Sequence, residues 1–160
     1  MHPILSKLKF KSQSPVLALN ATSEFSDVLA AWKKLTDVHT VIDKKSTYAF
    51  AVIFVTTPAD VKKLGVSALA RLGDDAPLWF GYPKKTSKKY PSTISRDQGW
   101  ESLGEKGFEP VSLVALDDDW SMLRFRQVAN IKTMIRRKGM TLSAEGKEKT
   151  INKTNKAIRK

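Results

Sequence analysis

Apolar residues along this chain fall into short continuous runs and into longer segments where they recur at helical spacing. The runs at 14–20, 38–43, 48–56 and 77–82 predict strands. The run at 48–56 is apolar on both faces, as a central strand of a parallel sheet should be. Alternation of apolar residues with lysines at 7–11 suggests a further strand at the edge of the sheet.

Three helices are predicted, two of them between these runs and one after the last run. The first covers 24–35, where apolar residues repeat every three or four positions. The second begins with a threonine, a proline and an early acid, which is a favourable helix start. The residues that signal the helix ends are Ser23 before the first helix, Thr57 and Gly73 around the second, and Ser95, Gln98 and Gly107 around the third.

The last apolar segments, 111–116 and 120–128, are joined by three aspartates, a length that suits an antiparallel hairpin. Strands that alternate with helices imply a mostly parallel sheet between two helical layers. We therefore predict a three-layer, Rossmann-like α/β fold of the methyltransferase type. It is reduced by one strand–helix unit, and its mostly parallel sheet ends in an antiparallel hairpin.

Charge divides the chain into two parts. The net charge is +12, of which residues 1–120 carry only +2 and residues 121–160 carry +10. This predicts an α/β domain over 1–128 and a basic, partly mobile C-terminal helix or tail over 129–160. The tail either associates with nucleic acid through its charge or is simply solvated.

Composition narrows the class of protein. Its 160 residues fit one domain, and 41% of them are hydrophobic, as in a globular protein. The chain has no cysteine, which excludes disulfides, thiolate zinc sites and a cysteine nucleophile. No apolar run is long enough to span a membrane, and the N-terminus does not resemble a signal peptide. We predict a soluble, cytoplasmic protein that does not associate with membranes, and the sequence leaves its oligomeric state open.

The predicted sheet locates a candidate binding edge. Open parallel sheets bind ligands beyond the carboxyl ends of their strands. The residues that follow the predicted strands are Asn20, Asp43, Thr56, Lys84 and Asp117, and these should share that edge.

The loop after the fourth predicted strand contains four lysines and two hydroxyl groups in residues 84–89. Lys84, Lys85 and Ser87, together with Arg96 near the next helix start, would attract a phosphate-containing small molecule. The alternative is a solvated loop that keeps the protein soluble. Trp120 begins the last strand beside the aspartates, where it can touch a ligand, whereas the other tryptophans fit a core.

The turn after the first strand bears on whether the domain is an adenosylmethionine-dependent methyltransferase. Adenosylmethionine sites of this fold usually have a glycine-rich turn there, and residues 20–25 contain no glycine. Asp43 has the position of an acid that holds ribose hydroxyls, but it does not compensate for the missing glycines. We predict a non-catalytic domain without a cofactor that binds an anionic ligand or a macromolecular partner. A divergent adenosylmethionine-dependent methyltransferase is the alternative.

Several short phrases resemble a known family. They are Leu-Trp-Phe-Gly-Tyr-Pro-Lys at 78–84, Ser-Arg-Asp-Gln-Gly-Trp at 95–100 and Val-Ala-Leu-Asp at 114–117, followed by the last strand. Over about residues 10–128 the chain is similar to an uncharacterised bacterial family with a reduced, methyltransferase-like Rossmann domain. The family has no accepted activity, so the resemblance implies no catalytic residue. It does point to Pro83, Lys84, Arg96, Asp97, Asp117, Trp120 and Ser121.

Overall fold

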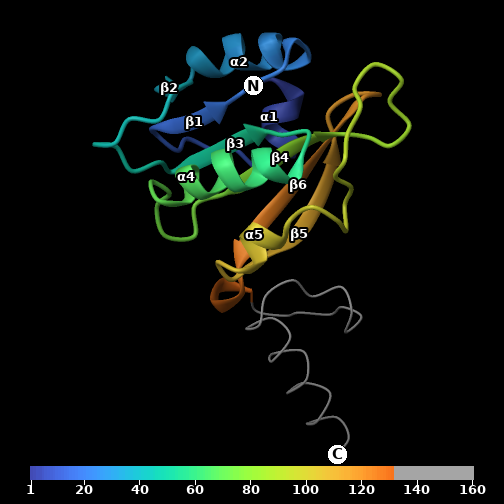
Figure 1. Cartoon of the computed structure of the whole chain (residues 1–160). Coiled ribbons are helices and arrows are strands. Elements are labelled where there is room, and N and C mark those ends of the chain that lie inside the picture. The colour runs from blue at the N-terminus through green and yellow to red at the C-terminus, as the bar shows by residue number, and fades with distance from the viewer. Residues whose placement is uncertain (132–160) are drawn as a thin grey trace, which may run out of the picture.

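The computed structural model describes residues 1–131, which form a six-stranded mixed sheet in the order β2-β1-β3-β4-β6-β5 (Figure 1). The first four strands in this order are parallel, and β6 pairs antiparallel with β4 and β5. This confirms the predicted α/β fold and its final hairpin. The predicted basic tail lies, from residue 132 on, outside the described residues. The strands are β1 (Val16–Leu19), β2 (Val38–His39), β3 (Phe50–Phe54), β4 (Leu78–Pro83), β5 (Phe108–Ala115) and β6 (Trp120–Gln127).

Helices cover both faces of the sheet, with α1 and α2 on one side and α4 on the other (Figure 1). The segment that follows Thr57 is one helical stretch containing a π turn, and Thr57 caps it by accepting a hydrogen bond from the Asp60 N–H, as predicted. The helical elements are α1 (Pro3–Lys7), η1 (Ser23–Phe25), α2 (Ser26–Lys33), α3 (Pro58–Asp60), η2 (Val61–Gly65), α4 (Val66–Leu69), α5 (Glu101–Gly104) and η3 (Val128–Asn130).

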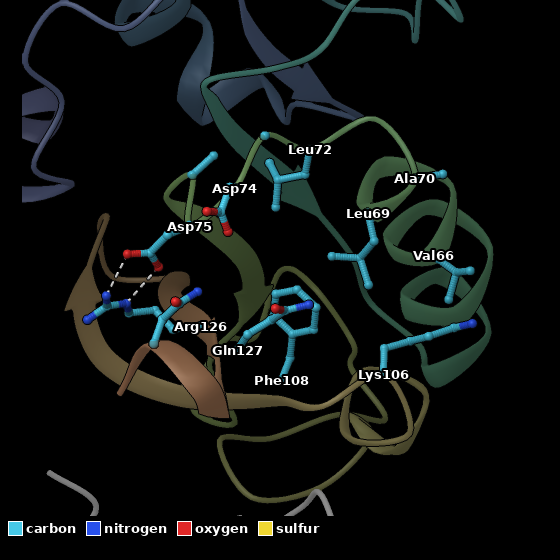
Figure 2. A pocket seen from close by; sticks show the side chains of 13 residues that line it. Val66, Leu69, Ala70, Leu72, Asp74, Asp75, Lys106, Phe108, Arg126 and Gln127 are labelled. Carbon is cyan, nitrogen blue, oxygen red and sulfur yellow. Dashed lines mark hydrogen bonds and ion pairs between the residues drawn. The ribbon is translucent and has the colours of Figure 1, made fainter. Parts of the chain in front are cut away.

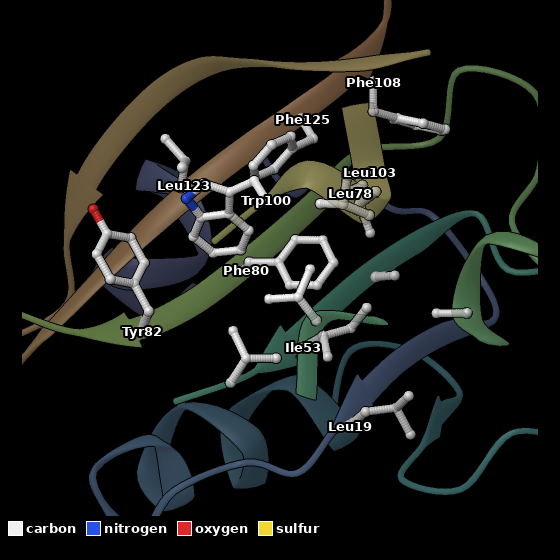
Figure 3. Packing of buried hydrophobic residues seen from close by; sticks show 14 of the residues in the cluster. Leu19, Ile53, Leu78, Phe80, Tyr82, Trp100, Leu103, Phe108, Leu123 and Phe125 are labelled. Atoms are coloured by element: carbon white, nitrogen blue, oxygen red, sulfur yellow. The ribbon is translucent and has the colours of Figure 1, made fainter. Parts of the chain in front are cut away.

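Aromatic side chains fill the core on each face. Under α1 and α2, the ring of Trp32 packs edge-on against Phe50, with 5.4 Å between centroids. On the other face, Trp100 packs against Phe80 and Phe125 at 5.5 and 5.0 Å (Figure 3). Each buried aromatic removes about 150–250 Å² from water, so these clusters supply much of the hydrophobic stabilisation. The prediction that Trp79 and Trp100 are core residues is confirmed.

Three predicted elements differ substantially in the structure. The strand predicted over 38–43 ends at His39, because the Asp43 N–H donates to the Tyr48 hydroxyl at 2.9 Å and the chain turns back. The strand predicted at 7–11 is wrong: α1 precedes a turn in which Lys9 has a φ of 64° and Leu8 is fully buried.

The helix predicted from Ser95 begins only at Glu101. Ser95 and Gln98 exchange backbone hydrogen bonds with each other and so form a narrow turn in place of a capping box. The Trp100 indole N–H donates to the Ser95 carbonyl at 2.7 Å, which fixes this turn against the core.

Two predicted end signals also fail. The helix after Thr57 ends at Leu69, since Gly73 donates to the Tyr48 carbonyl and belongs to the connection into the sheet. Ser23 was predicted to precede the first helix, but it lies inside η1, and Thr22 is the residue that precedes this helical turn.

Candidate functional site

The carboxyl ends of β1, β3 and β4 meet the tip of the β5–β6 hairpin at one edge of the sheet. The Asn20 amide donates to the Phe54 carbonyl at 2.9 Å, which ties the end of β1 to the end of β3. The Lys84 N–H donates to the Asp119 carbonyl at 2.8 Å, which ties the loop after β4 to the hairpin tip. Four of the five predicted edge positions, those after β1, β3, β4 and β5, therefore lie together as expected.

Asp43 is the exception. Its carboxylate accepts hydrogen bonds from the Lys45 N–H and the Ser46 hydroxyl, each at 2.9 Å, so it closes its own turn. The bond from the Lys45 backbone is the main cause that lowers the pKa of Asp43. Because β2 is short and the following turn is tied to Tyr48, before β3, Asp43 does not line either pocket at the candidate edge.

The first pocket at this edge, the β1–β3 pocket, has a volume of about 300 Å³. It contains three of the predicted site residues, Asn20, Thr56 and Trp120, together with Thr22, Phe54 and Tyr90. The Thr56 N–H and hydroxyl both donate to Asp60, at 3.0 and 3.1 Å, which fixes the end of β3 to the start of α3. The pocket thus has aromatic walls and a polar rim.

The second pocket, the β4–β6 pocket, has a volume of about 250 Å³ and contains the predicted Lys84, Lys85 and Arg96. One carboxylate, Asp97, also lines it and lies 3.8 Å from the Arg96 guanidinium. Burial raises the pKa of Tyr82, so its phenol keeps its proton and can donate a hydrogen bond. The remaining lining residues are Ser95 and Ser121.

The loop after β4 crosses this edge and is tied down along its length. The Ser87 hydroxyl donates to the Asp119 carboxylate at 2.7 Å and accepts from the Tyr90 N–H at 3.1 Å. Farther along, the Thr93 N–H donates to the Thr56 carbonyl at 3.1 Å. Ser87, predicted as a ligand contact, thus already has partners within the protein. The same holds for Asp117, whose carboxylate accepts from two N–H groups of the hairpin turn at 2.8 Å.

Sequence reasoning missed Glu24. Its carboxylate accepts from the Tyr90 hydroxyl at 2.6 Å and lies 3.0 Å from the Lys89 ammonium. The Tyr90 hydrogen bond, followed by the Lys89 contact, lowers the pKa of Glu24 to about 2. The signal was an acid in the turn after the first strand, on the same predicted edge as a lysine-rich loop.

A larger pocket of about 380 Å³ lies at the opposite edge, between α4 and the start of β5 (Figure 2). Leu69, Leu72 and Phe108 line one part of it. On the other part, Asp75 holds Arg126 by two hydrogen bonds of 2.6 and 3.0 Å. Arg126 thus forms an ion pair with an acid from the loop before β4.

Other site classes find no support in residues 1–131. No three histidine, aspartate or glutamate side chains gather there as a set that could hold a metal ion. No helix in this part of the chain has the length and apolar composition to cross a bilayer.

Known proteins resemble this chain in fold. Comparisons with protein-family models and with curated proteins find no match. Among solved structures, the chain is similar to a SAM-dependent methyltransferase from Aquifex aeolicus, with a TM-score of 0.55, 16% identity, and coverage of 78% of this chain and 88% of that one. It is also similar to N-methyltransferase NodS from Bradyrhizobium japonicum WM9, with a TM-score of 0.52, 12% identity, and coverage of 78% and 92%. At these identities the likeness shows a methyltransferase-type Rossmann-like fold.

The residues at the candidate edge do not fit adenosylmethionine in this arrangement. The turn after β1 carries side chains at every position. Asn20, with a φ of 56°, already donates its side-chain amide to the Phe54 carbonyl. The acid expected after β2 closes its own turn elsewhere. Tyr90 and Trp120, with ring centroids 5.0 Å apart, take up space over the same pocket.

Proposed function

We propose that this domain binds a small anionic molecule, of the phosphate-bearing class, in the β4–β6 pocket. The observation that carries the proposal is the convergence of Lys84, Lys85 and Arg96 on one cavity, to which residues 1–131 contribute a single carboxylate, Asp97. Two ammonium groups and a guanidinium offer charge-assisted hydrogen bonds, which are about twice as strong as those between neutral groups.

Hydroxyl groups complete the binding surface. The protonated phenol of Tyr82 and the side chains of Ser95 and Ser121 can donate to oxygens of the ligand. The fork of Arg96 matches two phosphate oxygens, whereas the lysines act as point charges. Asp97 lies beside Arg96 and so favours ligands that approach from the lysine side.

Titration calorimetry at low salt, with inorganic phosphate, pyrophosphate and ADP as probes, tests this function. Each of Lys84→Met and Arg96→Met should weaken binding about tenfold, since one charge-assisted bond contributes roughly 1.5 kcal/mol or more. Lys88→Met is the matched control, because Lys88 is on the same loop but does not line the pocket. Equal loss in the control, or no binding of any probe, would exclude this site.

Methyl transfer from adenosylmethionine is the second candidate, and the fold of the neighbours supports it. The β1–β3 pocket does not fit that group, as described above. Adenosylmethionine should therefore serve as a fourth probe in the same titrations. Binding that is lost in Asn20→Leu and kept in Lys84→Met would favour methyl transfer over the anion site.

A further inference from the structure

The loop after β4 carries a short segment, residues 88–90, that we name the strap, and its Tyr90 lines the β1–β3 pocket. Both sides of the strap are anchored by other contacts, through Ser87 to Asp119 and through Thr93 to Thr56. Between these anchors, Lys89 and Tyr90 share one carboxylate oxygen of Glu24. Tyr90 also donates its N–H to Ser87 within the same loop, so the Glu24 carboxylate is the contact that ties the strap to the turn after β1.

We propose that Glu24 holds the strap shut over the β1–β3 pocket, and that its release opens this pocket to a small planar molecule that accepts a hydrogen bond from the Trp120 indole. This proposal concerns a different pocket from the anion site and does not depend on it. Glu24 acts as a positioning residue in it, and Trp120 as the ligand contact.

Trp120 supplies the observation that points to a ligand. Its side chain is only 2% exposed, and its indole Nε1 has no acceptor within residues 1–131. Most buried donors in native proteins have a partner, because leaving one unpaired is costly. The closed strap therefore keeps a donor buried without a partner, and an entering acceptor would satisfy it.

The walls of the pocket indicate the shape of the occupant. The Trp120 ring lies 5.5 Å from Phe54 and 5.0 Å from Tyr90, centroid to centroid. A flat group fits between aromatic faces better than a branched one. Thr22 and Thr56 also line the pocket, and the Thr56 hydroxyl already donates to Asp60. The site thus suits a compact amide, lactam or heterocycle with a carbonyl or ring-nitrogen acceptor.

Acrylamide tests the proposal directly, since it is a small planar amide that also quenches tryptophan fluorescence. The quenching constant is measured for the whole chain and again in a Trp120→Phe background, and the difference is assigned to Trp120. The other three tryptophans are at most 1% exposed, so they contribute little. Glu24→Ala removes both strap contacts and should raise the open population, and with it the Trp120 quenching constant, about tenfold, which corresponds to about 1.4 kcal/mol.

Two further variants distinguish release of the strap from a general loss of stability of the protein. Tyr90→Phe removes the hydroxyl and keeps the ring, so it should give a smaller increase than Glu24→Ala. Lys88→Met should change nothing, because the lysine that contacts Glu24 is Lys89. If Glu24→Ala does not fold, the double variant Tyr90→Phe with Lys89→Met takes its place, since it removes both contacts from the strap side. Unchanged quenching in the folded variant, or an increase that persists without Trp120, would overturn the proposal.

Discussion

Glu24 illustrates what a single carboxylate does at this edge. The hydrogen bond from Tyr90, and then the contact with Lys89, lower its pKa from 4.5 to about 2. A group whose pKa is lower in the folded than in the unfolded chain stabilises the fold when it is ionised in both states. Its contribution is thus fully present above pH 4.5 and is lost as the pH falls toward 2.

We therefore expect Glu24→Gln to destabilise the protein at neutral pH, and the difference from the original chain to shrink as the pH falls below 4.5. Urea unfolding at a series of pH values measures this difference. Asp118→Asn is a suitable control, because Asp118 is exposed and lies in the turn of the β5–β6 hairpin, away from any helix start. A difference that stays constant across the acid range would show that Glu24 acts through packing alone.

Tyr48 shows why some residue-scale contacts escape sequence reasoning. It was predicted as the first residue of an apolar strand, and it is indeed fully buried. Its hydroxyl, however, contacts His39 at 2.8 Å and accepts from the Asp43 N–H at 2.9 Å. No sequence pattern links Tyr48 to His39 and Asp43, so these contacts could not be predicted. The contact shortens β2 and removes Asp43 from the candidate edge, which is why the ribose-binding role predicted for that acid has no support in the geometry.

At the scale of elements, predictions succeed where the signal is local. The helix after Thr57 begins as predicted, because its cap, proline and acid act within one turn. The helix from Ser95 fails, because burial of Trp100 and the bond from its indole to Ser95 override the capping-box spacing. The hairpin with three linking aspartates was also predictable from loop length. Tertiary packing, which the local pattern does not contain, decides the remaining boundaries.

Close packing of β3 against β4 gives an element-scale prediction. A Cβ at Gly81 would lie 2.6 Å from the Phe54 ring and 3.1 Å from the Met122 sulfur. Because both strands are central and buried, Gly81→Ala should destabilise the protein by about 1–3 kcal/mol, measured by denaturant unfolding. Phe54→Leu in the same chain should recover part of the loss, since a smaller side chain relieves the overlap. Simple additivity of the two changes would argue against a direct clash.

At the scale of the whole molecule, the candidate edge is assembled from segments that are far apart in sequence. The parallel order of β1, β3 and β4 brings the loops after them together, and this was predictable from the strand–helix alternation alone. The division of that edge into two pockets was not. Consecutive residues of β6, Trp120 and Ser121, point to opposite faces and so contribute to different pockets.

Charge provides the last prediction. Residues 132–160 contain ten Lys/Arg and two Asp/Glu, so a chain ending at Ile131 has a net charge of +4 where the full chain has +12. If nucleic-acid association depends on the C-terminal part, the full chain should bind a DNA duplex with an affinity that falls steeply with salt, and the shortened chain should lose most of it. Fluorescence anisotropy at several salt concentrations measures both affinities.

The full chain carrying Lys84→Met and Lys85→Met is the control, because it loses charge at the β4–β6 pocket only. Full affinity in the shortened chain would assign any binding to the α/β domain, and loss in the control would assign it to the pocket.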